Sequence, residues 1–179
     1  MRKTANEELG RLSLEDYRKA GKIPVVLVLD QVRSLHNVGS AFRTADAFRC
    51  AGICLCGITA TPPNREIHKT ALGAEESVDW KHFTDTPAAL LELKQQGYTI
   101  VAIEQTSSSV PLQNFQAPPD QKLALVFGHE LDGVSNEALS LCDSAIEVPQ
   151  HGTKHSLNVA VCVGVVLWEL AGRRLPKYG

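Results

Sequence analysis

Residues 145–170 have the sequence AIEVPQHGTKHSLNVAVCVGVVLWEL, and the rest of the chain is organised around this stretch. Residues 145–148 are predicted to form a short buried strand, which Pro149 ends because proline cannot donate to a sheet ladder. After a polar loop, Ser156 is expected to cap a helix by accepting hydrogen bonds from its first free backbone N–H groups. Residues 159–167 are almost entirely apolar, so this helix is predicted to be buried on all sides.

Asn158 lies in the first turn of this predicted helix. An amide is costly to bury unless hydrogen bonds satisfy it, so Asn158 needs partners. The polar loop, the capped helix start and this amide form a candidate ligand cradle, since helix N-termini offer free N–H groups. An ordinary capped core helix has the same features, and this stretch alone leaves both interpretations open.

Composition indicates one globular domain. The chain has 179 residues, of which 44% are hydrophobic and 21% are charged, and this size allows a sizeable core. The longest apolar run is about half of what a membrane span needs, and residues 1–12 lack the apolar centre of a signal peptide. We therefore expect a cytoplasmic protein without a membrane segment.

The cysteines and the net charge restrict the possible partners. Five cysteines with no CxxC pair predict neither a disulfide framework nor a zinc site, so we expect reduced thiols and no metal. The formal net charge is −2, whereas nucleic-acid binders usually have a basic surface. Any nucleic acid would therefore be held by a local patch, and the best candidate contains Arg65, His68 and Lys69.

Strands and helices are predicted to alternate after a charged helical arm at residues 1–22. Strands are predicted at 25–29, 53–58, 78–83, 98–104, 123–127 and 145–148. Helices are predicted from a cap at Asn37 onward, at 87–96, at 135–142 and after Ser156. Because the strands are rich in Val, Ile and Leu, this order predicts an α/β fold with a parallel sheet.

Three polar loops follow strands of this sheet and are expected to meet at one edge. They contain three pairs of candidate residues: Asn37 with Arg43, Gly128 with Glu130, and Ser156 with Asn158. No GxGxxG follows the first strand, and no GxxxxGK[ST], HExxH or GxSxG occurs. These absences disfavour Rossmann, P-loop, zincin and α/β-hydrolase enzymes.

Four segments resemble one known family in their order along the chain. They are HNVGSAFRTADAF (36–48), KTALGAEE (69–76), LVFGHELDGVS (125–135) and VPQHGTKHSLNVAVCVGVVLWE (148–169). Together they resemble the SpoU (TrmH-like) RNA 2′-O-ribose methyltransferases of the SPOUT superfamily, over about residues 23–170. His129 and Ala160 are mild departures from the family pattern.

The resemblance implies a parallel-sheet SPOUT fold with a deep C-terminal trefoil knot that binds S-adenosylmethionine. It places the methyltransferase domain at 23–175, between the arm and a tail at 176–179. The catalytic residues that it implies are Asn37, Arg43, Glu130, Ser156 and Asn158. The cofactor would be held by Glu104, Gln105, Gly128, Val148, Ser156 and Leu157. RNA would contact Arg43, Arg65 and Lys69.

The implied reaction moves a methyl group onto a ribose 2′-hydroxyl of RNA. Arg43 is a poor base, because guanidinium keeps its proton up to about pH 12, so we expect it to clamp a phosphate. His36, His151 and His155 are rival residues for proton transfer.

Several alternatives for the substrate and the activity stay open. Transfer RNA is expected as the substrate, with ribosomal RNA as the alternative. A catalytically silent RNA-binding module and an unrelated α/β nucleotide-binding enzyme are the other interpretations. The apolar closing helix, together with the resemblance, predicts a homodimer.

Overall fold

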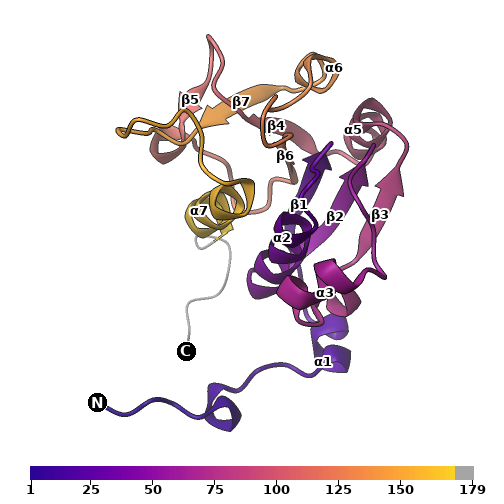
Figure 1. Ribbon diagram of the computed structural model, residues 1–179, viewed down its shortest axis with the longest axis vertical. Helices are drawn as coiled ribbons and strands as arrows, with labels where there is room; N and C mark the ends of the chain where they lie inside the picture. The colour runs from indigo at the N-terminus through magenta and orange to yellow at the C-terminus, as the bar shows by residue number, and fades with distance from the viewer. Residues whose placement is uncertain (172–179) are drawn as a thin grey trace.

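The computed structural model describes residues 1–171 and contains a parallel seven-stranded sheet (Figure 1). The strands are β1 (Ile23–Asp30), β2 (Cys50–Cys56), β3 (Trp80–Phe83), β4 (Thr99–Ile103), β5 (Val110–Pro111), β6 (Leu123–Phe127) and β7 (Ser144–Glu147). Their order across the sheet is β3-β2-β1-β6-β4-β7-β5. The predicted α/β class with a parallel sheet is confirmed.

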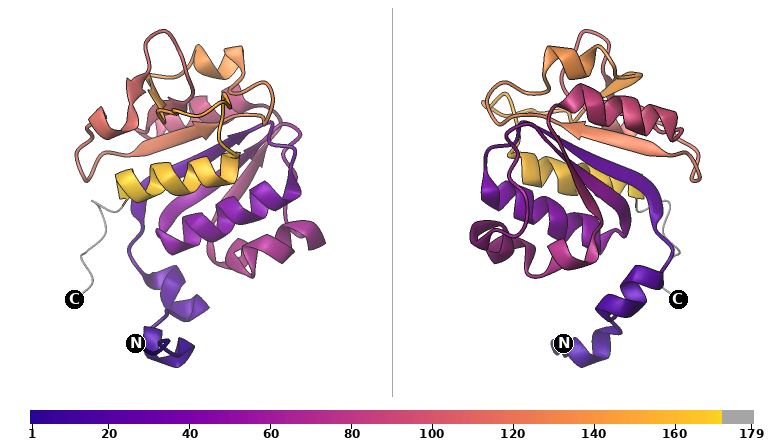
Figure 2. Two further views of the ribbon diagram at one scale, coloured as in Figure 1. Left: turned by 60° about the vertical axis from the view of Figure 1, so that its left-hand side comes forward. Right: turned by 90° about the vertical axis from the view of Figure 1, so that its right-hand side faces the viewer.

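Helices cover both faces of the sheet. The helices within residues 1–171 are α1 (Leu14–Lys19), α2 (Leu35–Ala47), α3 (Arg65–Ala71), α4 (Ala74–Ser77), α5 (Thr86–Gln95), α6 (Asn136–Leu139) and α7 (Val159–Ala171), with 3-10 turns at η1 (Asn6–Leu9) and η2 (Leu112–Asn114). Helices α2, α3 and α7 lie on one face, and α5 lies on the other (Figure 2).

Alternation along β1 explains the two layers. Val25, Leu27 and Leu29 belong to the core under α2 and α7, whereas Val26 and Val28 belong to the core under α5. Successive side chains of a strand point to opposite faces, so a strand covered on both sides is apolar throughout. The uninterrupted apolar run predicted for this strand therefore reflects its central position between β2 and β6.

Two predicted helix starts are wrong by a few residues. Ser34, not Asn37, caps α2, because its hydroxyl oxygen accepts from the N–H of Asn37. Helix α7 begins at Val159, and the oxygen of the Asn158 side chain, not that of Ser156, accepts from the free N–H groups of its first turn. In both cases two residues able to cap lie close together in the sequence, and their spacing alone does not decide between them.

Helix α7 is not buried on all sides within one chain. Val163, Val166 and Leu167 are buried in the core, but Val161, Val165 and Trp168 are exposed, Trp168 by 73%. The exposed residues follow helical spacing and form a separate apolar stripe on one side of the helix. Within a single chain this stripe has no covering element among residues 1–171.

Further differences concern the arm, the ends of elements and several short elements, including helices α3 and α4, for which the sequence predicts no helix. The predicted arm helix is two short pieces, η1 and α1, separated by Gly10 in a left-handed conformation. The short edge strand β5 was not predicted, and β2 begins three residues earlier than expected. The predicted domain end at 175 and the tail at 176–179 lie outside the described residues. The trefoil knot stays a prediction.

None of the helices in the described part of the chain is long and apolar enough to cross a membrane.

Candidate active site

A cavity of about 500 Å³ opens where the loops after β4, β6 and β7 meet. Because parallel strands place their carboxyl ends at one edge, loops distant in sequence come together there. The cavity is lined by all six residues expected to bind a cofactor: Glu104, Gln105, Gly128, Val148, Ser156 and Leu157. Its floor is apolar and includes Ile103, Phe127 and Ile146.

The loop after β6 lies against its own return segment beside this cavity. Backbone hydrogen bonds join His129 N to Gly133 O at 2.9 Å and Gly133 N to His129 O at 3.0 Å. A Cβ atom on Gly128 would lie 2.1 Å from Gly133 C and from Val134 N. Only glycine permits such a close approach of two backbone segments.

Glu104 and Gln105 connect the loop after β4 to its neighbours. Glu104 Oε2 accepts from Val134 N at 2.9 Å, and its Oε1 accepts from Gln105 N at 2.9 Å. Gln105 Nε2 donates to the backbone oxygen of His155 at 3.0 Å. These bonds fix the cavity walls on the β6 and β7 sides.

Beside the cavity, one hydrogen-bonded relay links residues from the three motifs. Asn37 Nδ2 donates to Glu130 Oε1 at 3.0 Å, and Asn158 Nδ2 donates to Asn37 Oδ1 at 3.1 Å. Glu130 and Asn158 line the cavity, while Asn37 lies behind them in the first turn of α2. Three of the five expected catalytic residues are thus in direct contact.

Glu130 also holds the loop after β1. Its Oε2 accepts from Arg33 N at 3.1 Å, and its Oε1 accepts from Ser34 N at 3.0 Å. Burial alone would raise the pKa of this carboxyl, but the hydrogen bonds from Asn37, Arg33 and Ser34 stabilise the anion and lower the pKa overall. Glu130 is therefore ionised at neutral pH and serves as an acceptor.

Ser156 lies in the exposed loop before α7 and lines the cavity, two residues from the relay. Cys162 lines it as well, and burial raises the pKa of its thiol to about 11, which leaves the thiol protonated at neutral pH. Of the rival histidines, His155 lines the cavity and offers its backbone oxygen to Gln105, whereas His36 and His151 do not line it.

Arg43 is not part of this arrangement within one chain. It is exposed on α2, does not line the cavity, and follows Asn37 by six residues. Six residues advance an α-helix by about 9 Å and turn it by about 240°, so the two side chains leave α2 in different directions. The sequence motif pairs Asn37 with Arg43, but the described chain does not bring them together.

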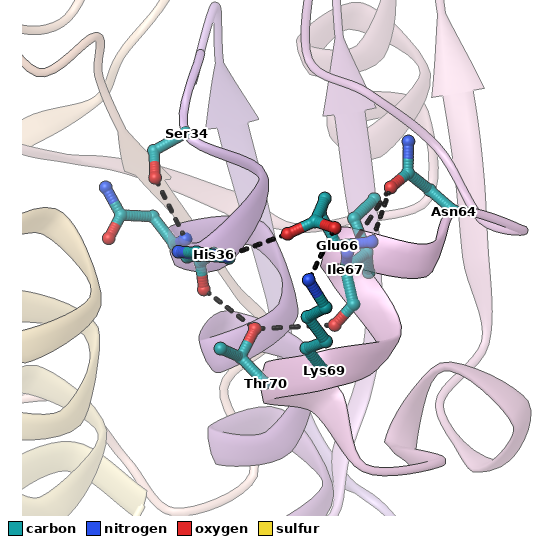
Figure 3. A network of polar contacts seen from close by, with 8 residues as sticks. Ser34, His36, Asn64, Glu66, Ile67, Lys69 and Thr70 are labelled. Atoms are coloured by element: carbon teal, nitrogen blue, oxygen red, sulfur yellow. Dashed lines mark hydrogen bonds and ion pairs between the residues drawn. The ribbon is translucent and has the colours of Figure 1, made fainter.

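Arg65 and Lys69 lie on α3, which is attached to the first turn of α2 (Figure 3). Glu66 pairs with Lys69 at 2.7 Å and with His36 at 3.3 Å, and Thr70 Oγ1 donates to the backbone oxygen of His36 at 3.0 Å. Lys69 therefore has its charge compensated within α3. Arg65 is exposed.

Sequence reasoning missed a buried carboxylate, Asp30, that holds the end of the loop carrying Glu130. Asp30 is fully buried at the end of β1, accepts from Thr86 Oγ1, and accepts from Ser135 N at 2.7 Å. It thereby ties α5 and the end of the β6 loop to the central strand. The signal was an aspartate directly after an apolar strand, a residue that is almost never fully buried without partners.

No group of histidine, cysteine or acidic side chains suited to a metal ion occurs within residues 1–171.

Comparison with known proteins places the chain. The model of the SpoU rRNA Methylase family matches residues 24–168. The 23S rRNA (guanosine-2′-O-)-methyltransferase RlmB of Vibrio vulnificus is 32% identical over 171 residues, which cover 96% of this chain and 68% of that protein.

Two solved structures have the same fold. The S-adenosylmethionine-bound rRNA methyltransferase of Sinorhizobium meliloti has a TM-score of 0.78 at 27% identity, covering 89% of this chain and 61% of that one. The A. aeolicus TrmH/SpoU tRNA modifying enzyme has a TM-score of 0.77 at 27% identity, covering 90% and 81%. The ordered motifs, the parallel sheet and these matches agree, and the chain belongs to the SpoU family of RNA methylases.

Proposed function

We propose that this chain transfers the methyl group of S-adenosylmethionine to a ribose 2′-hydroxyl of ribosomal RNA. The observation that carries the proposal is the Glu130–Asn37–Asn158 relay, in which Glu130 and Asn158 line the cavity. It joins one residue from each motif, over 93 and 121 positions of sequence, next to the loops expected to hold the cofactor.

The cavity fits S-adenosylmethionine. Its volume of about 500 Å³ lies within the range of roughly 300–1,000 Å³ usual for small-molecule sites. Apolar residues on its floor suit an adenine ring, and the backbone of the loops at Glu104, Gly128 and Val148 supplies hydrogen-bonding groups. When bound, the cofactor supplies an electrophilic methyl group on a positively charged sulfur.

The chain's own residues align and activate the ribose. An in-line displacement depends on the position of the attacking oxygen, and correct alignment accounts for much of the rate. Glu130, Asn37 and Asn158 hold the loops that border the target, and Ser156 lines the cavity on the same side. The guanidinium of Arg43 clamps a phosphate of the RNA, which polarises the neighbouring hydroxyl.

Ribosomal RNA is proposed because the curated relatives include 23S rRNA methyltransferases at 32% identity. Transfer RNA is the second candidate, supported by a tRNA modifying enzyme at 27% identity. The expectation of transfer RNA from the sequence alone has weaker support than ribosomal RNA.

We also propose that the protein forms a homodimer and works in the cytoplasm. The stripe of Val161, Val165 and Trp168 is an apolar surface of the kind that marks an interface, and two-fold dimers are its commonest solution. A second chain docked on α7 would lie near the exposed side of α2, which packs against α7, and thus near Arg43.

Radiolabelled S-adenosylmethionine tests the substrate class. Ribosomal and transfer RNA are prepared from a strain that lacks this protein, incubated separately with it, and analysed for alkali-resistant dinucleotides, which 2′-O-methylation produces. We expect label in ribosomal RNA, and none with a Glu130→Ala variant. Label only in transfer RNA would overturn the substrate class. Cofactor binding without label in any RNA would favour the silent module.

A further inference from the structure

Two exposed side chains, those of Arg33 and Leu131, come from segments that Glu130 joins, and the relay does not use them. The carboxylate of Glu130 binds the backbone N–H of Arg33 and so joins the loop after β1 to the turn at residues 129–133. Leu131 directly follows Glu130 in that turn. Arg33 and Leu131 are therefore both attached, through backbone contacts, to a residue of the site.

The turn that carries Leu131 is held from several sides. Its ends are joined by the two His129–Gly133 backbone hydrogen bonds, and His129 Nδ1 accepts from Leu131 N at 3.2 Å and from Asp132 N at 3.3 Å. Yet the side chain of Leu131 is 84% exposed and lines the cavity. Because the turn holds Leu131 in place, its side chain offers a fixed apolar surface at the cavity, and a ligand that covered this surface would gain favourable burial.

Arg33 offers the complementary group. It is exposed, and within residues 1–171 its side chain has no hydrogen-bond or ion-pair partner. Guanidinium groups bind phosphate oxygens in a bidentate geometry. Asp132 is exposed and adds a negative charge next to Leu131, so it would repel a phosphate on the Leu131 side of Glu130.

We infer that Arg33 and Leu131 form a binding subsite for one nucleotide of the RNA substrate. Arg33 binds its phosphate, and Leu131 packs against the face of its base or ribose. Asp132 sets the orientation, because it keeps the phosphate on the Arg33 side. This inference rests on the proposed function, since it takes RNA as the substrate.

The test measures RNA binding apart from methyl transfer. The full-length protein, saturated with S-adenosylmethionine, is titrated into a fluorescein-labelled single-stranded oligoribonucleotide of mixed sequence, and anisotropy is recorded at several salt concentrations. For Arg33→Gln, the slope of log affinity against log salt should become shallower by about 0.7, the value of one phosphate contact with a single strand. For Leu131→Ala, affinity should fall by roughly ten-fold with the slope unchanged.

Matched variants elsewhere provide the controls. Lys122→Gln removes an exposed cation just before β6, at the amino end of that strand, whereas the cavity lies at the carboxyl end. Leu91→Ala removes a leucine that is 50% exposed on α5. Neither should change affinity or slope. If Arg33→Gln and Leu131→Ala bind RNA like these controls, the subsite does not exist.

Two further measurements separate the subsite from rival roles of Leu131. Ten-fold weaker cofactor binding by Leu131→Ala, or its conversion to a monomer in gel filtration, would overturn the assignment. The proposed function fails in a different way: no RNA becomes methylated by the wild-type protein, whatever the two variants do to binding.

Discussion

Replacing Gly128 with alanine would test the architecture of the cavity directly. The added methyl group would lie 2.1 Å from Gly133 C and Val134 N. Both neighbours are backbone atoms, and Gly133 is held by two hydrogen bonds to His129. No flexible side chain can move aside, so the turn itself must shift by more than 1 Å to reach an ordinary van der Waals contact of about 3.5 Å.

The expected cost follows from that shift. Overpacking at a rigid site costs about 1–3 kcal/mol, and the loss of one turn hydrogen bond adds about 1 kcal/mol. For a domain of this size, about 3 kcal/mol lowers the melting temperature by roughly 6–12 °C. Because Gly128 and Gly133 line the cavity, affinity for S-adenosylmethionine should fall at least ten-fold.

Thermal unfolding and calorimetric titration with S-adenosylmethionine measure the two effects. Gly152→Ala is the matched control, because a Cβ atom at Gly152 would meet nothing within 4 Å. It should change neither quantity appreciably. A Gly128→Ala protein with wild-type stability and wild-type cofactor affinity would refute the close approach described here.

Three further predictions concern the site and its assembly. Arg43→Ala should nearly abolish methyl transfer while cofactor affinity stays within a few-fold, as measured by calorimetry; loss of cofactor binding would indicate a structural role. Folding lowers the pKa of Glu130, so the unfolded chain takes up this proton at a higher pH than the folded protein does. The free energy of unfolding should therefore fall as the pH drops below about 4.3 towards the pKa of the folded protein. Glu130→Gln should flatten that part of the stability–pH profile in acid unfolding, and an unchanged profile would contradict the assignment. Trp168→Glu should convert a dimer to a monomer in light scattering, because it places a charge in the exposed stripe of α7; a dimer that persists would exclude this stripe as the interface.

Most strands of the sheet could be predicted because a strand that is buried on both faces consists of apolar residues. The predicted strand at 123–127 has the bounds observed for β6, since five consecutive apolar residues between Lys122 and Gly128 leave little freedom. The two-residue strand β5 contains only Val110 and Pro111. So short a strand forms only because it pairs with β7, and a local sequence pattern contains no information about that pairing.

Part of the cavity lining was expected from the sequence, but the hydrogen bonds that connect the site were not. The cavity contains every expected cofactor residue, because the motifs mark the loops at the carboxyl ends of the strands. Glu130 accepts hydrogen bonds from the backbone N–H groups of Arg33 and Ser34. Every residue except proline has such a group, so the residue types at these positions do not predict the bonds. The separation of Arg43 from the relay depends on helix phase, because six residues of α2 separate Arg43 from Asn37.

The relay has a polarity, and one negative charge imposes it. An ionised Glu130 can only accept, so Asn37 must turn its Nδ2 towards it. This leaves Asn37 Oδ1 to accept from Asn158 Nδ2, and Asn158 Oδ1 is then free to accept from Ala160 N and Val161 N at the start of α7. A carboxylate on one loop therefore orients two amides and the beginning of a distant helix. Aspartate at position 37 would have almost the same shape as asparagine, but its carboxylate has no N–H to donate. Two acceptors would then face each other, and the hydrogen bond to Glu130 would be lost.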